Sequence, residues 1–334
     1  MKRRDFLQSV VGVGGAFLAS PWLQAMSEAA GPLGRVAFVK TTNRADGIAR
    51  AIKLRGLKPL AGKSVFLKPN FNSADATPGS THPDTLSALL QQLKSLGAGP
   101  VALGDRSGMG NTRGVMETKG LFPLAKDFGA KVVVFDELKE TDFQHARVDN
   151  MHWQRGFALP KPVLQADAIV STCCLKTHRY GGHFTVSLKN SVGLAAKQLP
   201  GDSYNYMREL HGSPHQRRMI AEINAAYTPA LVVIDGIQAF TDGGPDRGRL
   251  VESNVILAGA DRIALDAVGV ALLRHFGTTP EVSAGTIFQQ EQIARAVELN
   301  LGVHGPEQIV LLTDDDASAQ YAKQIRAVLD AAHA

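Results

Sequence analysis

Apolar and polar positions follow two different periods along the chain, and stretches of the two kinds alternate. Short continuous apolar runs are typical of buried strands, whereas apolar residues that recur every three or four positions are typical of helices that bury one face. Leu86, Leu89 and Leu93 share such a helical face, with Pro83 before them and Gly97 after them. Strand patterns occur at 35–39, 64–68, 101–103, 132–135, 168–172, 231–235, 254–257 and 309–312, and helical patterns at 45–56, 84–96, 114–128, 204–227, 264–276, 286–299 and 318–332.

This alternation predicts an α/β fold with one or more mostly parallel sheets and helices on both faces. Residues 139–162 carry neither period and are predicted to be irregular. We therefore expect residues 30–334 to form one α/β domain, with two Rossmann-like lobes at 35–150 and 163–334 around a central cleft. A chain of this length is long enough to bury a large core.

The first 29 residues have the pattern of an export signal. Arg3 and Arg4 precede Phe6-Leu7, an apolar run covers 10–19, and small residues continue to Ala29. The apolar run is much shorter than the roughly 20 residues of a membrane-spanning helix, so we expect no stable membrane insertion after processing. The sequence thus predicts a twin-arginine signal, recognition by the twin-arginine export machinery and a periplasmic or exported protein. This route carries folded proteins, which favours a cofactor inserted before export.

Composition excludes several function classes. Removing residues 1–29 takes away three basic and two acidic side chains, so the net charge falls from +5 to +4, and no long basic run remains for nucleic acid. The two cysteines, Cys173 and Cys174, are adjacent, which argues against a disulfide scaffold and against an iron–sulfur cluster of the protein's own. No G-x-G-x-x-G follows a predicted strand, so we expect no NAD or FAD.

Polar side chains gather where predicted strands end, which is where α/β proteins bind ligands. Lys68 and Asn70 follow the strand at 64–68, Asp105 follows 101–103, and Asp235 ends 231–235. Taken singly each is a weak signal, since an Asp at a strand end is more often a helix cap or turn residue. Four strand ends with such residues, counting the one at 172, predict a shared site.

The fourth strand end opens the segment that carries most of the candidate chemistry, residues 166–215. Four of the ten histidines of the chain fall in it. Lys176, Lys189 and Lys68 would form a cationic pocket for a carboxylate or phosphate, with Asn70 and Asn190 donating hydrogen bonds and Gly181-Gly182 exposing backbone N–H groups. The predicted substrate-binding residues are Lys68, Asn70, Lys176, Asn190, Gly181 and Gly182.

The histidines fit either metal binding or proton transfer. His178 and His183 flank a Gly-Gly loop, and His211 and His215 have a chelating spacing that Pro214 weakens. The predicted catalytic residues are His178, His183 and Lys189. The predicted metal ligands are His178, His183, His211, His215, Asp105 and Asp235. A hydrogen-bonded core or surface histidine is the alternative for each, and buried core residues are the favoured interpretation of the two cysteines.

The order of these motifs resembles the domain of unknown function family numbered 362 (DUF362) over residues 35–275. The motifs that carry the resemblance are Lys68-Pro-Asn70, Lys176-Thr-His178, Ser187-Leu-Lys-Asn190 with Gly193, His211, Val233-Ile-Asp-Gly236, Gly244-Pro245 and Asp261 to Asp266. Some members of the family carry a ferredoxin-like cluster domain, whereas this chain has no cluster cysteines. The layout of glycine-flanked His and Lys is also similar to the nickel-dependent lactate racemase family, in which a Lys binds a nickel-carrying nucleotide and His residues are metal ligands and proton carriers.

Together these features predict an enzyme that uses a divalent transition metal or a metal-containing cofactor and acts on a small anionic substrate by acid–base chemistry, as an isomerase or racemase would. In this prediction Asp105 and Asp235 orient histidines or complete the metal shell. A periplasmic protein that binds an anion or metal without turnover fits the same residues and remains the alternative.

Overall fold

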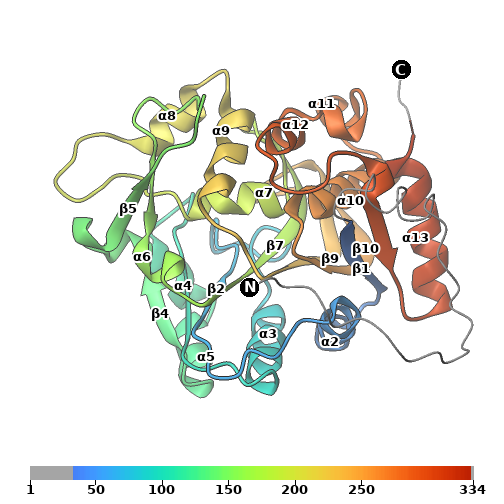
Figure 1. Cartoon of the computed structure of the whole chain (residues 1–334), viewed down its shortest axis with the longest axis horizontal. Coiled ribbons are helices and arrows are strands. Elements are labelled where there is room, and N and C mark those ends of the chain that lie inside the picture. The colour runs from blue at the N-terminus through green and yellow to red at the C-terminus, as the bar shows by residue number, and fades with distance from the viewer. Residues whose placement is uncertain (1–32, 332–334) are drawn as a thin grey trace, which may run out of the picture. The chain divides into compact units, whose positions relative to one another are not determined.

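The computed structural model describes residues 33–331, and the predicted export signal at 1–29 lies outside them. A nine-stranded sheet runs through the described chain in the order β11-β1-β10-β9-β7-β2-β3-β4, with β8 paired to β7 (Figure 1). Its strands are β1 (Gly34–Lys40), β2 (Val65–Lys68), β3 (Val101–Asp105), β4 (Lys131–Val134), β7 (Ala168–His178), β8 (His183–Thr185), β9 (Leu231–Gly243), β10 (Gly248–Gly259) and β11 (Ile309–Leu312).

Most strand pairs of this sheet are parallel, which confirms the predicted α/β class. The exceptions are β10, which is antiparallel to both β1 and β9, and β8, which turns back on β7. The segments predicted as two lobes share this one sheet, because β1 pairs with β10 and β11 while β2 pairs with β7. The structure therefore has one continuous sheet in place of two lobes with a cleft between them. Several parallel strands of this sheet end side by side, at their carboxyl ends.

Helices cover both faces of the sheet, because successive residues of a strand point to opposite sides. Val36 and Phe38 belong to the core under one set of helices, and Ala37 and Val39 belong to the core under the other. The first set includes α7 (Ser187–Asn190), α10 (Arg262–His275), α12 (Glu291–Glu298) and α13 (Asp316–Leu329). The second set includes α2 (Arg44–Arg55), α3 (Pro83–Ser95), α4 (Thr112–Thr118) and α5 (Leu121–Asp127).

Residues 139–162 are more ordered than the sequence predicted. They contain β5 (Phe143–Ala146) and β6 (Phe157–Pro160), an antiparallel pair, and the start of α6 (Lys161–Leu164). β5 has only two apolar residues among its four, and β6 ends in Pro160, which counts against a strand, so neither matches a strand pattern. Trp153 and Phe157 nevertheless anchor the region in a third core with residues of α8 (Tyr206–Gly212) and α9 (Gln216–Ile223).

Three predicted helices are interrupted in the structure, and the strands β7, β9 and β10 are longer than predicted. The helix expected at 286–299 is a short 3₁₀ turn at Ile287–Gln289 followed by α12. The helix expected at 204–227 becomes α8 and α9 with Pro214 between them, since proline disrupts a helix interior. The helix expected at 114–128 divides at Gly120, which adopts φ 68°. β7 continues past 172 to His178, so Lys176 and His178 belong to a buried strand and not to a loop.

Within residues 33–331, no helix combines the length and the apolar character needed to span a membrane.

Candidate functional site

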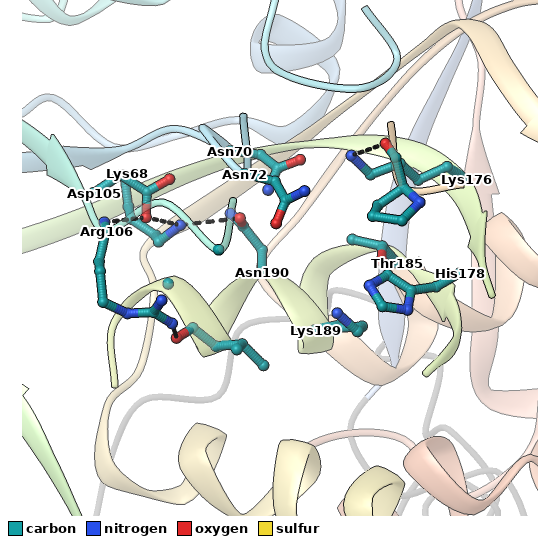
Figure 2. Close-up of a pocket in the computed structure, with 14 residues that line it drawn as sticks. Lys68, Asn70, Asn72, Asp105, Arg106, Lys176, His178, Thr185, Lys189 and Asn190 are labelled. Carbon is teal, nitrogen blue, oxygen red and sulfur yellow. Dashed lines mark hydrogen bonds and ion pairs between the residues drawn. The ribbon is translucent and has the colours of Figure 1, made fainter. Parts of the chain in front are cut away.

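The ends of β2, β3 and β7 and the helix α7 surround a small cavity, called here the inner pocket (Figure 2). Its volume is about 40 Å³. It is lined by Lys68, Asn70, Asn72, Asp105, Arg106, Gly108, Lys176, His178, Thr185, Lys189, Asn190, Val192, Gly193 and Pro245. Seven predicted site residues meet in this pocket. Lys68, Asn70, Asp105, Lys176 and His178 come from the ends of strands, and Lys189 and Asn190 come from α7.

A larger cavity of about 420 Å³, called here the outer cavity, shares Arg106, His178 and Lys189 with the inner pocket. Met109, Tyr180 and other apolar or aromatic residues also line it. A ligand could therefore place a compact polar group in the inner pocket and a less polar part in the outer cavity.

Lys68 and Asp105 form a buried ion pair on one side of the inner pocket. Lys68 Nζ lies 2.8 Å from Asp105 Oδ1, and both side chains are 2% exposed. Lys68 also donates to Pro69 O and to Asn190 Oδ1. A Cβ added at Gly193 would come within 2.3 Å of Asp105 Oδ1, so only glycine leaves room for the pair. Although burial lowers the pKa of Lys68, the carboxylate opposes this shift and makes the pair nearly neutral as a unit.

Lys176 and Arg106 are buried cations that form no ion pair within the described residues, and burial lowers the pKa of both. Lys176 donates to the backbone carbonyls of Gly79 and Pro245. Arg106 donates to carbonyls as well, among them Ala195 O at 2.9 Å. Backbone carbonyls satisfy hydrogen bonds but carry no net charge, and neither cation has a carboxylate within ion-pair distance in residues 33–331. The inner pocket is therefore electropositive.

Lys189 is the lysine of the pocket with the most perturbed chemistry. The residue is 9% exposed and lines both cavities. Its amine forms no hydrogen bond or ion pair with the side chains or backbone of residues 33–331. Burial, then the charges of Lys176 and Arg106, lower its pKa to about 7. The amine is therefore a proton acceptor near neutral pH, unlike an ordinary lysine.

The position of Lys189 is set by a carboxylate on the neighbouring helix α10. Asp266 accepts hydrogen bonds from Ser187 N at 2.7 Å and from Leu188 N at 3.2 Å, which fixes the first turn of α7. Burial raises the pKa of Asp266 to about 7. Asp266 lies outside the inner pocket lining, so we assign it a positioning role. Sequence reasoning left this residue ambiguous because its partners are about 80 residues away.

His178 lies beside Lys189 in the pocket (Figure 2). Burial, followed by the charges of Lys189 and Lys176, lowers its pKa well below the usual value, so the imidazole is neutral. A Cβ added at Gly182 would meet Lys189 Cε at 2.5 Å and His178 Nδ1 at 3.1 Å. The predicted importance of Gly182 thus has a different basis from the one expected: its missing side chain lets these two groups approach each other.

Four buried polar atoms that line the inner pocket have no hydrogen-bond partner in the described structure. They are Asn70 Oδ1, Asn72 Nδ2, His178 Nδ1 and Thr185 Oγ1. An unpaired buried polar group costs about 1–3 kcal/mol, so such atoms tend to be paired when a site is filled. Their convergence on one small cavity indicates that it accommodates a polar ligand.

Sequence reasoning missed Asn72, Arg106 and Thr185. Asn72 and Arg106 lie next to predicted residues, at the ends of the strands that carry Lys68 and Asp105, so proximity to those strand ends could have flagged them. Thr185 is opposite Lys176 in the β7–β8 pair, a relation that depends on pairing and has no sequence signal.

The other predicted metal ligands do not meet in the inner pocket. His183 lies opposite His178 in the β7–β8 pair, and both line a third cavity together with Gly181, Asp242 and Glu281. His211 faces the outer cavity, and its Nδ1 donates to Met207 O at 2.7 Å. His215 stacks on His152, with ring centroids 4.5 Å apart.

Asp235 is directed away from the pocket. It accepts hydrogen bonds from Arg44 of α2 and Thr85 of α3, because its position in β9 points its side chain to the α2–α3 face of the sheet. Asp105 is paired with Lys68.

Within residues 33–331, no group of three or more His, Cys, Asp or Glu side chains has the arrangement of a metal site. One unpaired imidazole among cations does not fit a metal ion held by the protein alone.

The two cysteines are buried free thiols at the centre of β7. Burial raises the pKa of Cys174 to about 11 and that of Cys173 well above its usual value. Both are therefore protonated near neutral pH, in keeping with their interpretation as core residues.

Three comparisons with known proteins bear on this chain. A family model described as "Domain of unknown function (DUF362)" matches residues 65–271. A thylakoid-associated protein of Synechocystis is 28% identical over 263 residues, which cover 75% of each chain. Among solved structures, the lactate racemase apoprotein from Thermoanaerobacterium thermosaccharolyticum matches with 17% identity and a TM-score of 0.42, over 68% of this chain and 54% of that one. A similarity this distant carries no inference about activity.

Proposed function

Because this chain belongs to the DUF362 family, whose description names no activity, we propose its function from the site: an enzyme that binds a small anion in the inner pocket and transfers a proton on it, with Lys189 and His178 as the proton-transferring groups. The observation that carries this proposal is Lys189, a residue with 9% exposure that lines both cavities, whose amine has no partner among the described residues and a pKa of about 7. Catalytic acids and bases need pKa values near the working pH.

The anion is favoured by the balance of charge in the pocket. Lys68 is neutralised by Asp105, so it holds the pocket together and does not contribute a free charge. Lys176 and Arg106 remain, and they attract a carboxylate or phosphate with up to two negative charges. The unpaired atoms of Asn70, Asn72 and Thr185 would complete its hydrogen bonds.

Proton transfer is favoured by the pairing of a neutral imidazole with an amine that titrates near pH 7. Neutral Lys189 would accept a proton from the carbon next to the bound carboxylate, and the positive charges of Lys176 and Arg106 would stabilise the electron pair left behind. His178 would return a proton through its unpaired Nδ1. If the proton leaves one face of the carbon and returns to the opposite face, the reaction is a racemisation. If it returns to a different carbon, the reaction is an isomerisation.

An isotope-exchange assay tests this function without knowledge of the product. Lactate, pyruvate, alanine and malate are incubated with the mature protein in D₂O, and deuterium at carbon is followed by NMR. We expect enzyme-dependent exchange with at least one short carboxylate. Binding of such an anion by calorimetry without any exchange would favour the alternative, a binding protein without turnover.

The metal-containing cofactor remains a prediction, and its test is elemental analysis of protein exported through its own signal. His178 and His183 were predicted as ligands, so their joint replacement by alanine should remove any stoichiometric divalent transition metal. Retention should also fall at acidic pH, since imidazole coordinates only when neutral. Normal folding and normal exchange activity in metal-free protein would contradict the prediction.

Export by the twin-arginine route is likewise proposed, on the pattern of residues 1–29. Replacing Arg3 and Arg4 together by lysine should leave the protein in the cytoplasm, because the export machinery reads the arginine pair. Cell fractionation and immunoblotting measure the distribution. Lys2→Arg is the control, since it changes a neighbouring basic residue and keeps the pair. Unchanged periplasmic yield in the double variant would rule out this route.

A further inference from the structure

We propose that Lys189 is a covalent catalyst that forms an imine with the carbonyl carbon of a small oxo acid bound in the inner pocket. The inference rests on the proposed function and names its substrate class, a carboxylate that also carries a ketone or aldehyde. It goes beyond proton transfer, because the amine would bond to the substrate and not only exchange protons with it.

The geometry sets Lys189 apart from the other amines of the pocket. Lys68 is held by Asp105, Pro69 O and Asn190 Oδ1, and Lys176 is held by two backbone carbonyls. Lys189 has no such partner within residues 33–331, yet it lines both the inner pocket and the outer cavity. Its nitrogen lone pair is therefore not engaged, and a ligand that enters from the outer cavity meets it directly.

The charges around Lys189 all favour its neutral, nucleophilic form. Lys176 of β7 and Arg106 after β3 lower its pKa together with burial, and the two nearby imidazoles, His178 and His211, add no negative charge. Both effects enlarge the neutral fraction of the amine relative to that of an exposed lysine. A lysine must be neutral to attack a carbonyl, and desolvation beside another cation is a known way to achieve this.

The remaining groups of the pocket select a carboxylate next to that carbonyl. Lys176 and Arg106 have no carboxylate partner in the described chain, and Asn70, Asn72 and Thr185 each present an unpaired buried atom. A volume of about 40 Å³ is several times the roughly 10–15 Å³ that one water needs, which suits a molecule of a few carbon atoms. A longer side chain would extend toward Met109 and Tyr180 in the outer cavity.

The step balances without any oxidant or further reactant. Lys189 Nζ bonds to the carbonyl carbon, the carbon–oxygen bond breaks, and the oxygen leaves as water with the two hydrogens of the amine. Neutral His178 passes protons between nitrogen and oxygen in the tetrahedral intermediate. The imine nitrogen, once protonated by solvent, acidifies the carbon–hydrogen bond next to the former carbonyl carbon. Because Lys189 is then bonded to the ligand, neutral His178 accepts that proton and returns it to the carbon, and hydrolysis by one water releases the ligand and regenerates the amine.

Reductive trapping tests the covalent bond directly. Mature protein is incubated with pyruvate and sodium cyanoborohydride, and the modified peptide is mapped by mass spectrometry. We expect one pyruvyl adduct, on Lys189, and none with propionate, which has no ketone. Lys58→Arg is the matched control, because Lys58 is an exposed lysine remote from both cavities, and it should keep the adduct. Lys189→Arg and Lys189→Met should both abolish it.

A second readout needs no trapping. An imine that forms and hydrolyses exchanges the carbonyl oxygen of pyruvate with solvent, so Lys189 should accelerate incorporation of ¹⁸O from labelled water at least about tenfold over the Lys189→Arg variant. Deuterium exchange that depends on Lys189, without adduct and without ¹⁸O exchange, would overturn the covalent role and leave the proposed function intact. Adducts spread over surface lysines would overturn it too. An adduct confined to Lys189 without deuterium exchange would support it and refute the proton-transfer function.

Discussion

Replacing Lys189 by methionine is expected to lower the deuterium-exchange rate at least about 100-fold, the lower end of what a positioned general base contributes. Methionine has a similar length and no charge, so it fills the space of the lysine stem while it removes the amine. Lys58→Met is the matched control, because it removes an exposed amine outside the site. Equal loss in the two variants, or no loss in either, would remove Lys189 from the mechanism.

The pH dependence of the exchange follows from the same residue. Lys189 loses its proton at about pH 7, so the rate should rise through that value and level off above it. His178 does not explain such a rise, because its pKa lies well below the usual value and it is neutral throughout this range. Asp266 also titrates at about pH 7, so Asp266→Asn is measured in parallel. A rise that persists in Asp266→Asn and is absent in Lys189→Arg identifies the amine.

The lowered pKa of Lys189 also determines how the methionine variant changes stability. An unfolded lysine keeps its proton up to about pH 10.5, whereas the folded one releases it at about 7. Between these values the unfolded state binds more protons, so the free energy of unfolding that depends on Lys189 rises with pH. Lys189→Met should therefore be more stable than the parent below pH 7, with a difference that shrinks toward pH 10. Urea unfolding of the parent and of Lys189→Met at pH 6 and pH 9 measures this difference in stability. A variant less stable than the parent at pH 6 would show that the amine is a structural partner.

Asp105→Asn is expected to reduce the free energy of unfolding by about 3–5 kcal/mol, the loss typical when one partner of a buried ion pair is removed. The change leaves the ammonium of Lys68 buried without its carboxylate, in a pocket that already contains Lys176 and Arg106. An amide also replaces only part of the acceptor capacity that receives Phe71 N and Arg106 N. Urea unfolding with circular dichroism measures the loss.

Two further variants test whether the loss of stability comes from breaking the Lys68–Asp105 ion pair or from substitution in general. Adding Lys68→Met to Asp105→Asn should restore part of the stability, since the uncompensated charge is then removed. Glu137→Gln removes one partner of an exposed pair with Arg113, with both side chains nearly half exposed, and should change stability far less. A double variant less stable than Asp105→Asn would contradict the charge explanation.

Fold class and the general place of the site could be predicted from the sequence, because both depend on local patterns. Apolar runs of strand length and leucines at helical spacing show that a segment buries one or both faces. They identify strands and helices even when the segments that pack against them are not known. Lys68, Asp105 and Lys176 lie at or near the ends of β2, β3 and β7, and parallel strands end at a common edge. These residues were predicted for that reason, and the structure brings them together.

The role of each site residue was decided by pairing across long sequence distances. Lys68 and Lys176 look alike in the sequence, yet Lys68 is neutralised by a carboxylate from another strand and Lys176 is not. Asp105 and Asp235 both follow apolar runs, yet Asp105 lies at the end of its strand and lines the pocket. Asp235 occupies a strand that continues to Gly243, on the face covered by α2 and α3.

The histidines show the same division between local and tertiary information. The sequence indicated that residues 166–215 hold the chemistry, but proximity along the chain does not place side chains in one cavity. β7 continues as a buried strand to His178, which lines the inner pocket, whereas His183 of β8 does not reach that pocket and meets His178 only at a third cavity. The break at Pro214 separates His211 from His215. The types of residue and the existence of most strands and helices follow from local sequence, whereas the ends of β7 and β9, the orientation of each side chain, the charges it faces and hence its pKa depend on strand pairing and helix packing.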